Sequence, residues 1–164
     1  MATKSKRIIG VDPGFHRMGY GVIEVCGSKL KVLDYGSTET AKSKKIEERI
    51  LEIACVLDDL IKHYQPDLLV VEEIFFFKNL KTAVNVAQAR GAIILVGAEN
   101  KVPLLELTPL QVKQSLTGFG RAEKGQMQKI VKMILNLKEI PKPDDAADAL
   151  AMAIAGNSWA RWGK

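Results

Sequence analysis

The chain has 164 residues, 47% of them hydrophobic, which gives one globular domain enough apolar surface for a core without disulfides or structural metals. Lysine and arginine number 24 against 19 acidic residues, and the net charge of +5 favours nucleic acid as a partner, although a basic surface without a partner gives the same charge. No apolar run approaches the roughly 20 residues of a membrane span, and the N-terminus lacks the apolar stretch of a signal peptide, so we expect one cytoplasmic domain over residues 1–164.

The first 40 residues predict three strands. Residues 7–11 form a short apolar run, and residues 19–25 and 30–38 alternate between apolar and polar side chains. Because only short turns separate these segments, we expect an antiparallel meander.

The middle of the chain predicts a helix followed by a buried strand. A helix over about residues 44–64 has one apolar stripe, with charged residues on its other face. The stripe consists of Ile46, Ile50, Ile53, Leu57, Leu60, Ile61 and Tyr64. Pro66 ends this helix, and residues 68–71 are apolar on both faces, as a central parallel strand is.

The second half alternates helices with one more strand. Thr108, Pro109 and Gln111 form a strong helix start, with a threonine cap, a first-turn proline and a glutamine placed for a capping box. The predicted elements are a helix at 79–100, a strand at 104–107, a helix from 109 to about 117, and helices at 123–137 and 144–160. Together with the meander, they predict an α/β fold with a five-stranded mixed sheet and helices on both faces.

Two cysteines, Cys26 and Cys55, lack the spacing of metal ligands. We expect both to be small, reduced core residues, and we expect no disulfide between them.

Four acidic residues stand at the boundaries of predicted elements. Asp12 and Glu72 each end a buried strand, and Asp145 and Asp148 lie three residues apart where the last helix begins. Carboxylates placed in this way can converge, and they would repel one another unless a divalent cation held them together. Two simpler interpretations stay open at this point: acids suit a helix N-terminus, and Asp12 precedes a Pro-Gly turn.

Glu73 competes with Glu72 for a place in such a cluster. Neighbouring residues on a strand point to opposite faces of the sheet, so only one of the two can join Asp12.

Seven short strings occur in order along the chain and together resemble a known family. They are Asp12-Pro13-Gly14, Gly19-Tyr20-Gly21, Val71 to Phe75 with Lys78-Asn79, Gln88 to Gly91, Val112 to Gln114, Ala122 to Lys124, and Asp145 to Leu150. Each string alone is common, but seven in this order at compatible spacing resemble the RuvC family of Holliday-junction resolvases. The resemblance covers residues 7–155.

The resemblance implies an RNase H-like fold and a metal-dependent endonuclease that resolves Holliday junctions in recombination and repair. It matches Asp12, Glu72, Asp145 and Asp148 to the catalytic ligands of Mg²⁺, with two ions per site and Mn²⁺ as a substitute, and it matches Glu72 rather than Glu73. The implied products carry a 5′-phosphate and a 3′-hydroxyl.

The resemblance also implies DNA contacts. Phe75 matches an aromatic residue that stacks on an unpaired base, while Phe76 and Phe77 have no matched role and at least one of the three rings would suit a core plug. Lys113 and Lys124 match basic positions near the scissile phosphate. Further basic residues suit phosphate contacts, namely Arg121 in the loop 118–122, Lys78, Lys81 and Arg90.

The implied partners are a four-way DNA junction, a second copy of the chain, and the branch-migration proteins RuvA and RuvB. The small residues Ala83, Ala87, Gly91 and Gly97 on the helix at 79–100 permit close helix contact, which suits packing within the chain as well as an interface. The resemblance favours the interface, since a two-fold dimer suits two symmetric cuts. Two alternatives remain open: an RNase H-like nuclease with another substrate, such as RNA, and a junction-binding module without activity.

Overall fold

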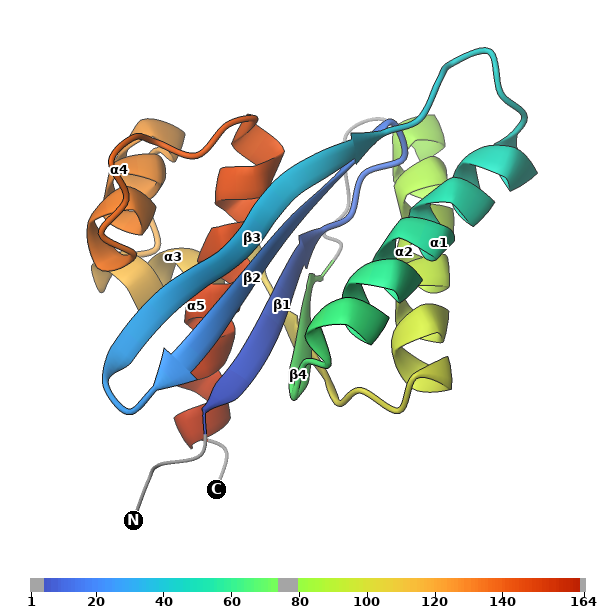
Figure 1. Ribbon diagram of the computed structural model, residues 1–164. Helices are drawn as coiled ribbons and strands as arrows, with labels where there is room; N and C mark the ends of the chain where they lie inside the picture. The colour runs from blue at the N-terminus through green and yellow to red at the C-terminus, as the bar shows by residue number, and fades with distance from the viewer. Residues whose placement is uncertain (1–4, 74–79, 163–164) are drawn as a thin grey trace.

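The computed structural model describes residues 5–73 and 80–162, and it contains the predicted elements in the predicted order (Figure 1). They are β1 (Lys6–Asp12), β2 (Arg17–Cys26), β3 (Lys29–Glu39), α1 (Ile46–Tyr64), β4 (Leu68–Glu72), α2 (Leu80–Glu99), β5 (Leu104–Leu107), α3 (Pro109–Thr117), α4 (Lys124–Ile134) and α5 (Asp144–Trp162). The predicted bounds differ from these by a few residues, most at the end of α4.

The five strands form one mixed sheet in the order β3-β2-β1-β4-β5. The meander β1-β2-β3 is antiparallel, and β4 and β5 continue the sheet in parallel with β1. Val11 is opposite Val71 across the parallel pair, and Asp12 is opposite Gly19 across the antiparallel pair. The predicted mixed sheet is therefore confirmed, and its register brings the ends of β1 and β4 to the same edge.

Helices cover both faces of the sheet, as predicted (Figure 1). Ile9, Val11, Leu69 and Val71 pack with apolar residues of α1 and α2. The alternate residues, among them Ile8 and Val70, pack with α3, α4 and α5. Since side chains alternate along a strand, Asp12 and Glu72 fall on the same face as Ile8 and Val70, which is the face that α5 covers.

Glycines let α5 lie directly against the strands. A Cβ atom on Gly10 would lie 2.1 Å from the carbonyl oxygen of Ala149, and one on Gly19 would lie 2.0 Å from the carbonyl oxygen of Asp145. The alanine-rich surface of α5 completes this close approach, because most of its buried side chains are alanine. The N-terminal turn of α5 is thereby placed over the end of β1.

The predicted capping box of α3 is present. The Thr108 hydroxyl accepts a hydrogen bond from the backbone N–H of Gln111 at 3.1 Å, and the Gln111 side-chain oxygen accepts one from the N–H of Thr108 at 2.8 Å. Pro109 occupies the first turn, where backbone N–H groups have no partner within the helix, so the N–H that proline lacks is not missed. This cap fixes the helix that carries Lys113.

The prediction that the charged residues of α1 lie on its outer face is wrong for Arg49. Arg49 is 5% exposed, whereas Ile46 of the predicted apolar stripe is 40% exposed. The Arg49 guanidinium donates to the Thr40 hydroxyl at 2.9 Å and to the Phe15 carbonyl at 3.2 Å, and it lies over the Phe15 ring. These bonds satisfy its charge and anchor the loop that follows Asp12.

The core placement of both cysteines is also wrong, because Cys26 and Cys55 are exposed and unpaired. Cys26 is the last residue of β2, next to a turn, and Cys55 lies between the buried Ile53 and Leu57 on a different face of α1. Across residues 5–73 and 80–162, no helix is both long enough and apolar enough to cross a membrane.

Candidate active site

Two carboxylates stand side by side at one edge of the sheet. Asp12 ends β1 and Glu72 ends β4, and these parallel strands are neighbours in register. Glu73 follows on the opposite side of the strand and is exposed, and its N–H donates to the carbonyl oxygen of Leu107 at 2.8 Å. The structure thus places Glu72, rather than Glu73, beside Asp12, and strand alternation explains why only one of them does.

The other two acids come from α5. Asp145 lies in its first turn against Gly19, the residue that pairs with Asp12, and Asp148 lies one turn further along the helix. The docking of α5 therefore brings acids that are more than 130 positions from Asp12 in the sequence to the same edge of the sheet.

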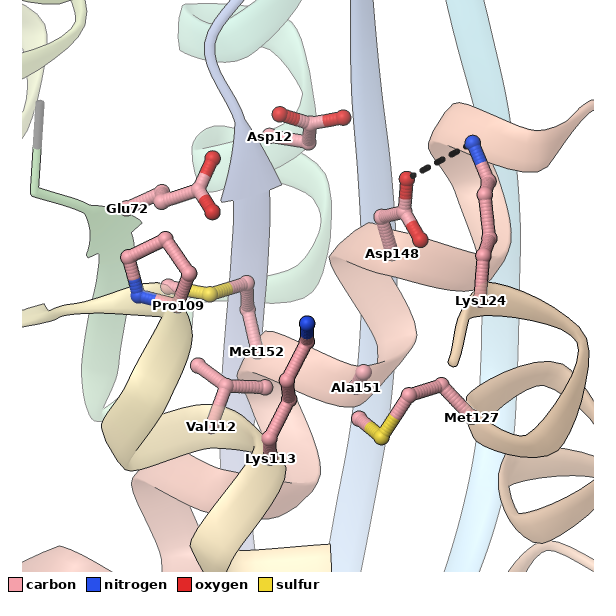
Figure 2. A pocket seen from close by; sticks show the side chains of 10 residues that line it. All are labelled: Asp12, Glu72, Pro109, Val112, Lys113, Lys124, Met127, Asp148, Ala151 and Met152. Carbon is pink, nitrogen blue, oxygen red and sulfur yellow. Dashed lines mark ion pairs between the residues drawn. The ribbon is translucent and has the colours of Figure 1, made fainter. Parts of the chain in front are cut away.

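A cavity of about 260 Å³ opens where these elements meet (Figure 2). Its polar lining consists of three carboxylates and two lysines, and apolar residues of α3, α4 and α5 form its floor. The lining residues are Asp12, Glu72, Pro109, Val112, Lys113, Lys124, Met127, Asp148, Ala151 and Met152. Two of the predicted phosphate-binding lysines, Lys113 and Lys124, thus face the predicted acids across one cavity.

The carboxylates in this cavity are held in an unfavourable environment. The pKa of Asp12 is raised to about 8, first by burial and then by the other carboxylates, of which Glu72 has the largest effect. The pKa of Glu72 is also raised, by burial and by Asp148, although a hydrogen bond with Asp12 opposes the shift. Burial likewise raises the pKa of Asp148, against the effect of Lys124. A bound cation would relieve this repulsion.

Two cations already compensate part of the charge. Lys124 Nζ lies 3.3 Å from Asp144 and 3.5 Å from Asp148, and Figure 2 shows the second of these pairs. Partial burial acts to lower the pKa of Lys124, but its acidic neighbours outweigh this effect and the pKa is raised. Arg17 at the start of β2 pairs with Asp145 at 3.3 Å. Each of the two predicted acids on α5 therefore has a cationic partner.

The acids of the described residues are near one another but are not grouped as a metal site. Within the described residues, no three acidic, histidine or cysteine side chains lie close enough to form a ready-made metal site. Asp12 and Glu72 have no ion pair in that part of the chain, whereas Asp145 and Asp148 are turned toward arginine and lysine. The donor set still fits Mg²⁺, because every candidate ligand is a carboxylate and the described lining of the cavity includes neither cysteine nor histidine.

The remaining predicted DNA contacts are distributed differently. Arg121 lies outside the acidic cavity and borders a separate groove between α3 and α4, where Phe119 is 73% exposed. Lys81 is exposed in the first turn of α2. Phe75 and Lys78 lie outside the described residues, as do Phe76 and Phe77.

Two arginines near the acids make contacts that the sequence did not predict. Arg90, which we expected to extend the basic surface, donates to the Glu72 carbonyl oxygen at 3.0 Å and pairs with Glu106, so it holds the end of β4. Arg17 was not singled out. The signal for it was its position directly after the Asp-Pro-Gly loop, but its partner Asp145 is 128 residues away.

Stability should fall as the pH rises, because the folded-state pKa of Asp12 lies above its ordinary 3.8. Between about pH 4 and pH 8, the folded chain holds a proton that the unfolded chain has released. The contribution of this proton to the free energy of unfolding is fully present below about pH 4, and it is lost as the pH rises through about 8. We expect the melting temperature, followed by circular dichroism, to decline over this range in the wild type and less in Asp12→Asn. Equal declines would contradict the raised pKa.

Known proteins of one family resemble this chain in sequence and in fold. The family described as Crossover junction endodeoxyribonuclease RuvC has a sequence model that matches residues 8–156. The protein of that name from Caldicellulosiruptor saccharolyticus is 54% identical over 149 residues, which are 90% of each chain. The solved structure of Thermus thermophilus RuvC is 35% identical with a TM-score of 0.90, and that of the same protein in complex with Holliday junction substrate is 33% identical with a TM-score of 0.88; each covers 96% of both chains. These likenesses confirm the RNase H-like fold that the resemblance implied.

Proposed function

The chain belongs to the RuvC family of crossover junction endodeoxyribonucleases, and we propose that its acidic cavity is where it hydrolyses DNA phosphodiesters at a Holliday junction. The observation that carries this proposal is the placement of Asp12 and Glu72 in one cavity with Lys113 and Lys124. Carboxylates hold a divalent cation and lysines attract a phosphate, and these are the two requirements of metal-dependent phosphodiester hydrolysis.

The four carboxylates divide into a fixed pair and an adjustable pair. Asp12 and Glu72 are fixed by strands and present their oxygens to the cavity, while Asp145 and Asp148 can join them by leaving their cationic partners. Two Mg²⁺ ions, or Mn²⁺ in their place, would supply an activated water and stabilise the leaving 3′ oxygen. The products would carry a 5′-phosphate and a 3′-hydroxyl.

Lys113 and Lys124 position the phosphate. Both side chains line the cavity, from α3 and from the first turn of α4. A phosphate that approaches the acids gives Lys124 an alternative partner to Asp148, which frees that carboxylate for the metal.

The remaining DNA contacts extend outward from the cavity. Arg121, next to the exposed Phe119 on the neighbouring groove, contacts the DNA backbone beyond the scissile phosphate. Phe75 and Lys78 belong to the segment that directly follows the strand of Glu72, and we assign them to the unpaired bases and phosphates at the junction centre. The T. thermophilus relative has been solved in complex with Holliday junction substrate.

The proposed active form is a two-fold dimer, because a four-way junction needs two symmetric cuts and each chain has one such cavity in its described part. The exposed face of α2 supports this proposal. Leu80, Val84 and Leu95 are 77%, 49% and 57% exposed, and with the exposed Ala87 and Gly91 they form one apolar stripe at helical spacing.

Leu95→Glu should convert the dimer into a monomer. A carboxylate in the middle of an apolar interface loses its hydration, so we expect the dissociation constant of the dimer to rise by about 100-fold or more. Sedimentation velocity measures the change. Leu51→Glu on α1 is a matched control, since Leu51 is 64% exposed and lies on another helix, and this variant should remain dimeric. If both variants remained dimeric, α2 would not be part of the dimer interface.

The proposed setting is recombinational DNA repair in the cytoplasm. The branch-migration proteins RuvA and RuvB would deliver the junction to the dimer, which would cut it by paired nicks.

The test of this function is cleavage of a labelled synthetic four-way junction and of the matching linear duplex, with and without Mg²⁺. Symmetric nicks that DNA ligase can reseal, in the junction alone and only with Mg²⁺, are the expected result. Equal cutting of both substrates would indicate a general nuclease, and tight junction binding without any product would indicate a silent binding module.

A further inference from the structure

Arg17 connects one predicted metal ligand to an acid outside the metal site. Its guanidinium lies 3.3 Å from a carboxylate oxygen of Asp145 and 3.6 Å from one of Glu39. Arg17 begins β2 and Glu39 ends β3, and the two residues are opposite each other in the antiparallel register. The guanidinium therefore has two carboxylates within reach, and only Asp145 borders the acidic cluster.

Asp145 is the predicted ligand most affected by this pairing. Asp12, Glu72 and Asp148 all line the cavity, whereas Asp145 does not. Asp145 belongs to the α5 turn that lies against Gly19, two residues along β2 from Arg17. Its carboxylate is thus close to the cluster but is paired with the Arg17 guanidinium.

We propose that Arg17 is an internal competitor of the divalent cation for Asp145, and that Glu39 is the alternative partner that receives the guanidinium when Asp145 turns to the ion. This inference rests on the proposed function of the cavity as a metal site. The Arg17–Glu39 pair then sets the cation concentration at which the site fills.

The exposure of the three side chains suits an exchangeable contact. The side chains of Arg17, Asp145 and Glu39 are 44%, 27% and 71% exposed. Ion pairs this close to solvent are weak and break easily, so the guanidinium can change partners without disturbing the core. Arg49, by contrast, is 5% exposed and satisfies fixed groups.

The test measures Mn²⁺ binding to the DNA-free protein, from the electron paramagnetic resonance signal of the unbound ion. Arg17→Gln should bind Mn²⁺ about 3- to 10-fold more tightly than the wild type, because Asp145 loses its competing cation. Glu39→Gln should bind about 2- to 3-fold more weakly, because the guanidinium then has Asp145 as its remaining partner. Neither variant removes a ligand of the metal.

The double variant distinguishes exchange from a general effect of charge. If Glu39 acts through Arg17, then Glu39→Gln has no effect in the Arg17→Gln background, and the double variant binds as Arg17→Gln does. A general electrostatic effect would instead lower the affinity equally in both backgrounds, and that result would overturn the proposal. Unchanged Mn²⁺ affinity in Arg17→Gln, with weaker binding of the junction, would also overturn it and make Arg17 a phosphate contact.

Failure of the underlying function would be recognised separately. In one outcome, the wild type binds Mn²⁺, Asp12→Asn does not, and Arg17→Gln binds with wild-type affinity. This outcome would reject the role of Arg17 and leave the metal site in place. Wild type that neither binds Mn²⁺ nor needs a divalent cation for cleavage would reject both.

Discussion

Asp12→Asn will abolish cleavage of the four-way junction, with a rate reduced on the order of 10³-fold or more, about 4 kcal/mol of transition-state stabilisation. Asparagine keeps the shape of the side chain but cannot ionise to the carboxylate that would hold a cation, and it replaces the group of the cavity whose pKa is raised to about 8. The variant should still bind the junction, because Lys113 and Lys124 are intact. Single-turnover cleavage and a gel-shift titration measure the two properties.

Asp144→Asn is the matched control for this result. Asp144 is adjacent to Asp145 on α5 and pairs with Lys124 at 3.3 Å, but it is absent from the lining of the cavity. A change at Asp144 should alter the cleavage rate by less than about 10-fold, as expected for one exposed ion pair. Similar losses in both variants would mean that the local charge matters more than the position of Asp12, and full activity in Asp12→Asn would refute the assigned site.

Gly19→Ala will destabilise the fold and reduce cleavage in the same variant. The new Cβ would lie 2.0 Å from the Asp145 carbonyl oxygen, so the N-terminal turn of α5 must move away from β2. Forced overpacking of this kind costs about 1–3 kcal/mol in the free energy of unfolding. Because the displaced turn carries Asp145 and continues to Asp148, the folded fraction should also cleave at least about 10-fold more slowly, as small misplacements of catalytic groups do.

Two further glycine variants separate these effects. Gly156→Ala meets the Val70 Cγ2 atom at 2.3 Å, further along α5 than Asp148, so it should also lose stability but with a smaller loss of activity per folded molecule. Gly125→Ala on α4 meets no atom within 4 Å and should be neutral or slightly stabilising, since alanine favours a helix. Urea denaturation measures the free energy of unfolding of each variant. A wild-type value for Gly19→Ala would show that α5 can move away from β2 at no cost in stability.

The local pattern of the sequence predicted the elements and placed candidate acids at their ends. Alternation along β4 predicted that only one of Glu72 and Glu73 joins Asp12, because strand periodicity decides which side chains share a face, and the family resemblance selected Glu72. Thr108 and Gln111 predicted the start of α3 for a similar reason, since a capping box needs only residues three positions apart. In each case the interacting groups are close in the sequence or lie on strands whose pairing follows from hydrophobicity.

Residues that make long-range contacts were beyond such patterns. Arg49 looked like part of the solvated face of α1, yet it is buried because Thr40 and the Phe15 carbonyl accept its hydrogen bonds. Cys26 and Cys55 looked like small core residues, yet both lie on the surface. Periodicity describes one helix or strand at a time, and it contains no information on which polar partners the neighbouring element provides.

What the sequence by itself determined is the set of candidate acids, the order of the elements along the chain and the family to which the motifs belong. Only the tertiary structure decided how those acids are paired: Asp148 with Lys124, and Asp145 with Arg17, 128 residues away. The docking of α5 on Gly10 and Gly19 creates these pairs. Electrostatic interaction depends on distance in space, and that distance is set by the packing of the helix on the sheet rather than by any local sequence pattern.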